Sequence, residues 1–355
     1  MKARSQTRTP HVLFVAAECR DIATAGGLGD VVRELSKAIR LQGIRVSIAM
    51  PYYGLVTKSA ISLGKFKVLF GDRPWVVEWF QCSLDGVTVY LLRKHAFFGG
   101  RYKTVYINSL QHPFEDDGRR FAFFSSAVLA FLQHHAPLRS VNTLHCHDWH
   151  TGTLFTLLKY DPLYSKLLER VRTVFTIHNL EYQGIRPFTS RINRAWFTFS
   201  DWFPSLYTSL KRSGSIHDLR NPKPPLRWFN PMRAAIQLAD HVTTVSPRYA
   251  RELTQADNPT LKFSGGKGLE HDIARRKRQR RFHGILNGLD YTIHTPSALR
   301  PAYDVTRLGW EKTRMKHKHT FISEEWIERP LVVMVTRAAD QKVKMLLEKH
   351  HGKLL

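Results

Sequence analysis

An alternation of short apolar runs with helical segments is the feature that most constrains how this chain folds. His11–Ala17 is rich in β-branched and aromatic residues, typical of a strand buried in a parallel sheet. A glycine-containing turn follows, and apolar residues then recur at helical spacing up to Gly43, a typical C-terminal stop. Residues 44–50 are predicted to form a second strand, which Pro51 ends. This order predicts a doubly wound, Rossmann-like α/β fold with a parallel sheet.

Residues 65–93 depart from this alternation. The segments FKVLFG, WVVEWFQC and VTVYLLR look like antiparallel strands, and Asp85-Gly86 has the composition of a hairpin turn. We therefore expect a β-hairpin region inserted at an edge of the sheet. An amphipathic helix is predicted from about Glu115. Strands and helices then alternate again, at residues 141–145, 171–177, 232–239 and 241–246, before a Gly-rich, basic loop at 254–283.

The composition is that of a globular protein with a core, because 43% of the 355 residues are hydrophobic. No apolar window of about 18 residues is present, so we expect no membrane-spanning helix. The three cysteines, Cys19, Cys82 and Cys146, are too few and too widely spaced for a disulfide framework or a zinc site. Reduced thiols and a cytoplasmic location fit this pattern.

The charge is strongly positive, with 54 Lys and Arg against 29 Asp and Glu, a net +25. Such a balance predicts attraction to polyanions, including nucleic acid and phosphorylated small molecules. The densest basic run is residues 275–281, which is typical of a solvated face or loop. No nucleic-acid-binding motif surrounds it, so nucleic-acid binding is the weaker alternative.

Polar motifs follow the predicted strands at the points where they end. GGLGD follows the first strand, HDWH follows Leu144, His178-Asn179 follows Ile177, and Ser246 follows Val245. Ligands of doubly wound sheets bind outside the carboxyl ends of the strands. We therefore expect these motifs to form one site.

Each motif allows a functional and a purely structural interpretation. The glycines at 26–29 open a helix whose N-terminus favours an anion, but they also suit a simple tight turn. Asp148 can accept hydrogen bonds from sugar hydroxyls or cap the next helix. His178 can donate to a hydroxyl or lie buried against the backbone.

Two further patterns concern charged ligands. The run HCHDWH suggests a metal at first, but alternate strand residues point to opposite faces and no second ligand cluster has suitable spacing. We therefore expect no metal. Arg337 and Lys342 follow the last predicted strand, and a guanidinium with an ammonium suits a diphosphate.

Taken together, these motifs resemble those of bacterial glycogen synthases and plant starch synthases, the ADP-glucose-dependent glucosyltransferases of the GT-B fold. The resemblance is carried in order by TAGGLGDVV, DDGRRFAFFSSAVL, HCHDWHTG, VFTIHNLEYQG, ADHVTTVSPRYARE, GKGLE and GILNGLD, and VTRAADQK resembles the start of the family's second domain. It extends from His11 to about Lys342. The chain is thereby expected to be the N-terminal half of a GT-B fold.

The resemblance implies transfer of glucose from ADP-glucose to an α-1,4-glucan with retained configuration, with no metal or other cofactor. It assigns catalytic positions to Asp148, which would bind donor hydroxyls, and to His178, whose carbonyl or ring would face the reacting sugar. Arg337 and Lys342 would neutralise the leaving diphosphate. The substrate-binding residues it implies are Glu18, Gly26, Gly27, Asp30, Asn179 and Tyr182.

Two departures from the family pattern shape the expected organisation. Thr24 stands where the family loop has a lysine, and the sequence ends at residue 355, soon after the second domain would begin. We expect a disordered segment at 1–10 and a catalytic domain at 11–325. Residues 326–355 would then be the truncated start of a second domain, as in a truncated or frame-shifted product. Activity would then require a separate C-terminal-domain polypeptide. The alternative is a non-catalytic glucan-binding remnant or regulatory partner.

Overall fold

The computed structural model describes residues 10–54, 59–99, 104–106, 115–190, 197–288 and Lys318. The chain divides into two units, Met1–Leu289 and Asp290–Leu355. This division lies earlier in the sequence than the expected boundary at 325/326. Outside the described residues lie Arg337, Lys342, residues 1–9 of the predicted segment 1–10, and the predicted segment 326–355.

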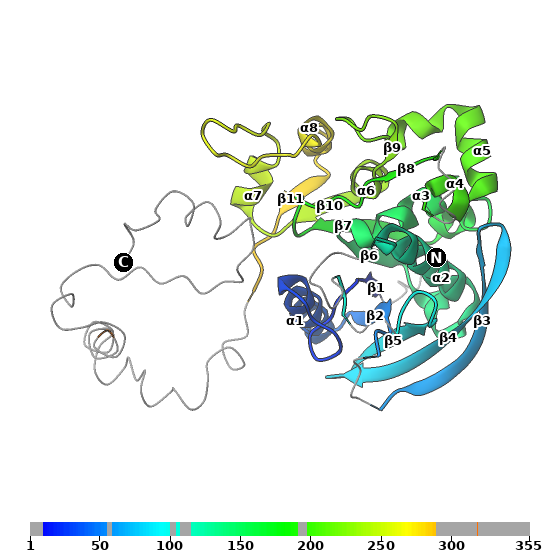
Figure 1. The fold of residues 1–355 in the computed structure, drawn as a ribbon. Helices are drawn as coiled ribbons and strands as arrows, with labels where there is room; N and C mark the ends of the chain where they lie inside the picture. Colours follow the sequence, from blue (N-terminus) through cyan, green and yellow to red (C-terminus); the bar gives the residue numbers. More distant parts are fainter. Residues whose placement is uncertain are drawn as a thin grey trace, which may run out of the picture. The chain divides into compact units, whose positions relative to one another are not determined.

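A nine-stranded sheet forms the centre of the first unit, in the order β11-β10-β7-β6-β1-β2-β5-β4-β3 (Figure 1). Neighbouring strands from β11 to β5 are parallel, and β4 and β3 continue the sheet in antiparallel pairing. The predicted mostly parallel α/β fold is therefore confirmed. The strands are β1 (His11–Val15), β2 (Arg45–Pro51), β3 (Ile61–Phe70), β4 (Arg73–Leu84), β5 (Val87–Arg93), β6 (Thr143–His147), β7 (Arg172–Ile177), β10 (His241–Thr244) and β11 (Phe282–Gly284).

Helices cover both faces of this sheet. In Figure 1, α1 lies on one face, while α2, α3 and α6 pack beside one another on the other. None of the helices in the described part of the chain is long and apolar enough to cross a membrane. The helices are α1 (Gly27–Leu41), α2 (Asp117–His134), α3 (Gly152–Tyr160), α4 (Phe199–Trp202), α5 (Pro204–Ser213), α6 (Pro231–Leu238), α7 (Pro247–Glu252) and α8 (Glu270–Arg278). The remaining elements are the 3₁₀ helices η1 (Ala136–Ser140), η2 (Trp149–Thr151), η3 (Ser165–Glu169) and η4 (Ser215–Leu219) and the two-stranded pair β8 (Arg186–Pro187) and β9 (Trp228–Phe229).

The predicted hairpin at Asp85-Gly86 is confirmed, and a second one precedes it. Both residues of the β4–β5 turn have positive φ, 48° and 78°, and so do Gly71 and Asp72 between β3 and β4, at 64° and 53°. Positive φ at both central residues defines the two-residue turn whose twist matches that of the strands. β3 ends the sheet on this side. Its ladder shifts register between Ser62 and Gly64, and two exposed lysines follow.

Helix α2 is more deeply buried than its predicted amphipathic pattern suggests. Nearly every side chain from Asp117 to Leu132 is buried. The long strands β3 and β4 explain this, because they pack against the helix. Phe66 meets the Phe131 ring edge-on at 5.0 Å, and Trp79 stacks on the same ring at 4.2 Å.

The predicted basic loop at 254–283 contains a helix and a strand, so that expectation was wrong in part. Glycine and charge masked the signal of α8, yet its acidic first turn and basic last turn both suit the helix dipole. Arg276, in the middle of the basic run, is buried and donates to the backbone carbonyls of Ala239 and Asp240. The run is therefore only partly a solvated face.

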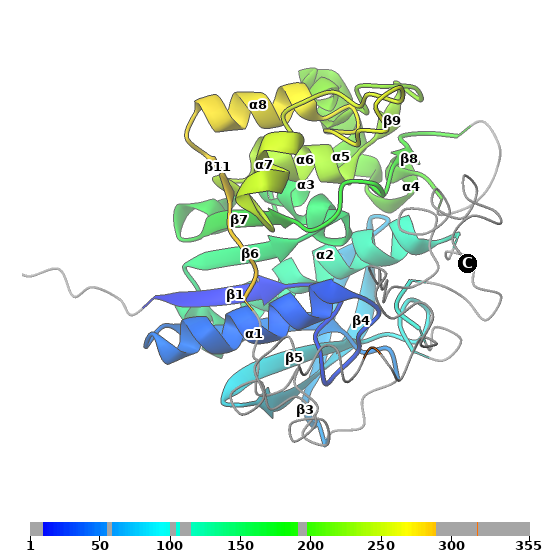
Figure 2. The ribbon, with the colours of Figure 1, turned by 90° about the vertical axis from the view of Figure 1, so that its left-hand side faces the viewer.

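The strand order reverses direction between β1 and β6. From β1 the chain continues to β2 on one side of the sheet and later returns to β6 on the other. β1 runs from left to right in Figure 2, and β6 and β7 are parallel to it. The carboxyl ends of these strands therefore share one edge, at the point where such folds bind ligands.

Two glycines that open helices give a matched test of packing. An added Cβ at Gly152, the first residue of α3, would lie 2.2 Å from the carbonyl oxygen of Pro231, whereas one at Gly27, the first residue of α1, would meet nothing within 4 Å. We expect Gly152→Ala to lower the free energy of unfolding by about 1–3 kcal/mol through overpacking. Gly27→Ala should be neutral or slightly stabilising. Urea unfolding measures both, and equal midpoints for the two variants would contradict the described approach of α3 to α6.

Candidate active site at the carboxyl ends of the central strands

Glu18 follows β1 and holds the glycine turn in place. Its side chain is almost fully buried, and Oε2 accepts hydrogen bonds from the backbone N–H groups of Ala25 (2.5 Å) and Gly26 (2.8 Å). The sequence predicted Glu18 and Gly26 as substrate-binding residues. The structure brings them together, but the backbone N–H of Gly26 already donates to Glu18 and is not directed at a ligand. Gly27, the first residue of α1, remains exposed at the helix N-terminus.

Tyr106 is a residue of this site that the sequence analysis missed. Its Oη donates to Oε1 of Glu18 at 2.5 Å, and its ring stacks on His150 with centroids 4.9 Å apart. Burial, together with the Glu18 charge, raises the pKa of Tyr106 well above its ordinary value, so the phenol keeps its proton and donates. The bond joins residues 88 positions apart, and no local spacing in the sequence signals it.

Asp30, predicted to bind substrate, lies in an ion-pair cluster on α1. Its Oδ1 accepts from Nη1 of Arg20 at 3.1 Å, and the same guanidinium also pairs with Glu34. Asp30 is partly exposed. In this arrangement its carboxylate orients Arg20 beside the glycine turn.

Asp148 follows β6 and ties it to β7. Its Oδ1 accepts from the backbone N–H groups of His178 (2.8 Å) and Asn179 (3.4 Å), and the side chain is buried. It does not cap the following 3₁₀ helix, which was the structural alternative. The backbone at Asp148 has φ 56° and ψ 176°, a conformation that costs about 1–3 kcal/mol for a residue other than glycine. Strain of this kind concentrates at functional sites.

The environment of Asp148 changes its ionisation. Burial raises its pKa to about 7, against the opposing effect of the two backbone hydrogen bonds, and the nearby Glu18 charge adds to the rise. Asp148 is therefore poised between a neutral and an ionised carboxyl near neutral pH. An ionised Asp148 can accept hydrogen bonds only, whereas a protonated one can also donate.

His178, Asn179 and Tyr182 lie on the segment that follows β7. Nε2 of His178 is 3.0 Å from Nδ1 of His147, and burial lowers the His178 pKa to about 4, so the ring is neutral. Oδ1 of Asn179 accepts from the backbone of Glu181 at 2.9 Å, which shapes a local turn.

Tyr182 lies farther along this segment and is 46% exposed. Its Oη donates to Asp117 at 3.1 Å, and Arg186 pairs with the same carboxylate. Tyr182 is thus anchored to the start of α2 and packs against Trp149, while part of the residue stays exposed.

The histidines of HCHDWH pack as aromatic rings. His145 and His147 stack at 4.4 Å and both contact Phe14, and Nε2 of His145 is 2.6 Å from Oγ1 of Thr176. Within the described ranges, no group of three or more His, Cys, Asp or Glu side chains is arranged to hold a metal ion. Cys146 and the other two cysteines are free thiols.

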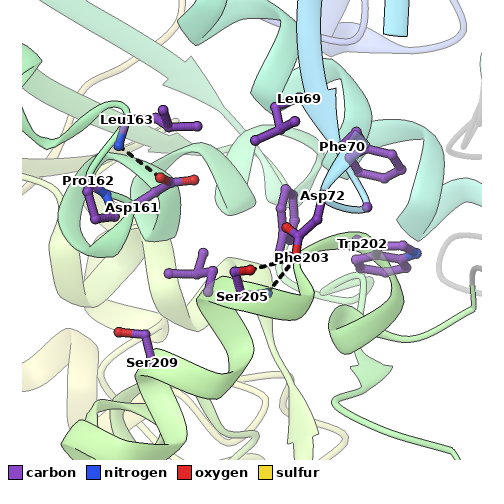
Figure 3. Close-up of a pocket in the computed structure, with 12 residues that line it drawn as sticks. Leu69, Phe70, Asp72, Asp161, Pro162, Leu163, Trp202, Phe203, Ser205 and Ser209 are labelled. Carbon is purple, nitrogen blue, oxygen red and sulfur yellow. Dashed lines mark hydrogen bonds between the residues drawn. The ribbon is translucent and has the colours of Figure 1, made fainter. Parts of the chain in front are cut away.

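A separate hollow of about 420 Å³ lies at the β3–β4 turn, away from these strand ends (Figure 3). Its walls are mainly apolar. Asp72 accepts from the backbone N and Oγ of Ser205 at 3.0 and 2.6 Å, and Asp161 accepts from the backbone of Leu163 at 2.9 Å. None of the predicted site residues lines it. Its carboxylates help to build α5 and the segment after α3.

The strand-end site combines groups suited to a ligand rich in hydroxyls. Two buried carboxyls, Glu18 and Asp148, follow the neighbouring strands β1 and β6 at the reversal of strand order, beside the neutral imidazole of His178. Carboxylates accept from hydroxyls, and a neutral imidazole can donate to them. The exposed start of α1 offers backbone N–H groups to an anion.

Comparisons with known proteins point to one family. The family model for the starch synthase catalytic domain matches residues 11–275. A glycogen synthase of Hydrogenobaculum sp. (strain Y04AAS1) is 33% identical over 349 residues, covering 95% of this chain and 64% of that protein. A glycogen synthase of Bacillus cereus (strain B4264) is 31% identical over 341 residues, covering 94% and 64%. The chain therefore spans less than two-thirds of the length of these relatives.

Among solved structures, one is similar to the chain in fold and, more distantly, in sequence. It is the catalytic domain of starch synthase IV from Arabidopsis thaliana, bound to ADP and acarbose. It aligns with a TM-score of 0.68 and 28% identity, over 96% of this chain and 65% of that one.

The buried histidines predict acid sensitivity. Burial lowers the pKa of His145 and of His150 to about 3 and that of His147 well below its ordinary value, whereas the unfolded side chains titrate at about 6.5. Below about pH 6.5 the unfolded state therefore binds protons that the folded state does not bind. As the pH falls, each of these histidines should lower the free energy of unfolding by about 1.4 kcal/mol per pH unit. Asp148, with its raised pKa, contributes to this pH dependence with the opposite sign between about pH 4 and 7 and offsets the contribution of about one histidine.

Urea unfolding between pH 7 and pH 5 measures this slope, and His150→Phe provides the matched control. The phenyl ring can keep the contacts of His150 with Tyr106, Phe121 and Trp149, but it cannot take up a proton. The slope of the variant should be smaller by about 1.4 kcal/mol per pH unit. An unchanged slope would show that His150 already titrates normally in the folded protein.

Proposed function

Since this chain belongs to the starch synthase catalytic domain family, we propose that it is the acceptor-side half of a retaining glucosyltransferase of the glycogen and starch synthase type. The reaction we propose is transfer of glucose from ADP-glucose to the end of an α-1,4-glucan. The observation that carries this proposal is the strained, buried Asp148 beside His178 at the reversal of strand order. Those are the positions at which the family resemblance places the reacting sugar.

Each side chain has a proposed task that follows from its surroundings. An ionised Asp148 accepts hydrogen bonds from hydroxyls of the donor glucose while it keeps the ends of β6 and β7 together. His178 faces the reacting sugar through its ring or its carbonyl group. The start of α1 at Gly27, whose preceding turn Glu18 holds, directs backbone N–H groups toward the diphosphate.

The ligands proposed for this site follow from the relatives. Starch synthase IV was solved with ADP and acarbose, and we propose that this chain takes ADP-glucose and a glucan at the corresponding place. No metal or other cofactor enters the proposed reaction. Arg337 and Lys342, outside the described residues, are proposed to neutralise the leaving diphosphate. The free cysteines support a reducing, cytoplasmic setting.

The proposal is tested with radiolabelled ADP-glucose and glycogen, together with retention of the chain on a glycogen matrix. Transfer of label to glycogen supports the enzyme. Retention without transfer, with or without a separately supplied C-terminal domain, favours the alternative of a glucan-binding protein. A chain that neither transfers label nor binds glycogen or ADP-glucose contradicts the proposal.

Asp148 allows the charge of the site to be tested separately from its structure. In Asp148→Asn the amide oxygen can still accept from the N–H groups of His178 and Asn179, so stability should change by less than about 1 kcal/mol. The lost charge should weaken ADP-glucose binding and transfer roughly tenfold or more. Asp148→Ala, the control, removes the acceptor as well and should cost about 1–3 kcal/mol of stability. Calorimetry and urea unfolding separate the two effects, and wild-type affinity in Asp148→Asn would exclude the proposed role.

A further inference from the structure

Two neutral histidines contact each other at the carboxyl ends of β6 and β7, in the proposed sugar site. Nδ1 of His147, at the end of β6, lies 3.0 Å from Nε2 of His178, just after β7. His147 is fully buried, whereas His178 is partly exposed. Burial lowers the pKa of both rings far enough to keep them neutral. Each ring therefore carries one proton, and the contact requires one nitrogen to donate and the other to accept.

The position of the His147 ring is fixed by its neighbours. Its ring packs against both His145, at 4.4 Å and 24°, and Phe14, at 5.2 Å and 17°, which also contact each other. The strand ladder pairs His147 with Thr176 on β7, two residues before His178. Tilting the ring would break these contacts, and a 180° flip would replace Nδ1 by Cδ2 and lose the hydrogen bond to His178, so Nδ1 stays directed at His178.

The other nitrogen of His147 decides which ring donates. Nε2 of His147 is buried and has no hydrogen-bond partner among the described residues. If His178 donated, His147 would carry its proton on Nε2 and would bury an N–H group without an acceptor. Orphaned buried N–H groups are rare, and an unused lone pair is the more tolerable outcome. His147 should therefore carry its proton on Nδ1 and donate to His178.

We propose that His147 is a positioning residue that fixes His178 as the tautomer protonated on Nδ1. Nε2 of His178 is then occupied as an acceptor, and its Nδ1–H has no partner among the described residues and is left for a ligand. Resting on the proposed function, this makes the His178 side chain a hydrogen-bond donor to a sugar hydroxyl and not a base. The backbone N–H of His178 is already held by Asp148, so ring and backbone are fixed from two strands.

The tautomer is measured directly by long-range ¹H–¹⁵N correlation spectra of the full chain with ¹⁵N-labelled histidine at pH 7.5. Signals of His178 are assigned by their loss in a His178→Gln variant. We expect a protonated Nδ1 and an unprotonated Nε2 for His178. A protonated Nε2 in the unmodified protein would overturn the proposal.

Three substitutions at position 147 test whether His147 sets this tautomer. Asparagine can place an amide nitrogen near the Nδ1 position, whereas glutamine reaches the Nε2 position and phenylalanine keeps only the stacked ring. His147→Asn should preserve the His178 tautomer, and His147→Gln and His147→Phe should shift it toward protonation on Nε2. An unchanged His178 tautomer in either His147→Gln or His147→Phe overturns the proposal. If one of these variants misfolds, the other still provides the test.

Ligand measurements keep this inference distinct from the proposed function. If the chain transfers glucose, His147→Phe should lower kcat about three- to tenfold, with His147→Asn closer to the unmodified protein. If the chain binds neither ADP-glucose nor glycogen while the tautomer behaves as expected, the proposed function fails and the role of His147 in setting His178 stands.

Discussion

The hydrogen bonds from the two residues that follow β7 to the Asp148 side chain organise the whole strand-end site. They fix the backbone of His178 and Asn179, and therefore the direction in which the chain leaves the sheet toward Tyr182. When Asp148 is ionised, hydrogen bonds to its charged oxygen contribute about 1.5–3 kcal/mol, which is enough to offset the strained backbone of this residue. The strained backbone is retained because the β6–β7 ladder and the hydrogen bonds of the buried Asp148 side chain hold the residue in this conformation.

Glu18 plays a comparable part on the next strand. It satisfies backbone donors of the glycine turn from within the protein, and Tyr106 occupies its second oxygen. Two buried carboxyls in one site also influence each other, because the charge on Glu18 disfavours a second charge on Asp148. A cationic or hydroxyl-bearing ligand between them would relieve this repulsion, whereas an anion would have to stay at the start of α1.

Local patterns in the sequence predicted the parallel strands, the glycine turn before α1 and the hairpin at Asp85-Gly86, because each depends on residues close together in the chain. They also placed Asp148 and His178 at strand ends. They could not reveal that Tyr106 reaches Glu18, or that Asp30 pairs with Arg20, since side-chain pairing depends on tertiary packing. Helix α8 was hidden by its glycine-rich, basic surroundings, and the all-round burial of α2 depends on how the hairpin packs on it.

The outermost strand β3 has a consequence for how molecules of this protein meet. A free strand edge is a template on which another copy can add a strand and begin an ordered aggregate. The register shift between Ser62 and Gly64 interrupts that template, and the exposed Lys65 and Lys67 repel an identical edge. Among the described residues the opposite border, β11, is only three residues long. Both borders therefore discourage growth of the sheet from one molecule to the next, which favours discrete particles over fibrils at high concentration.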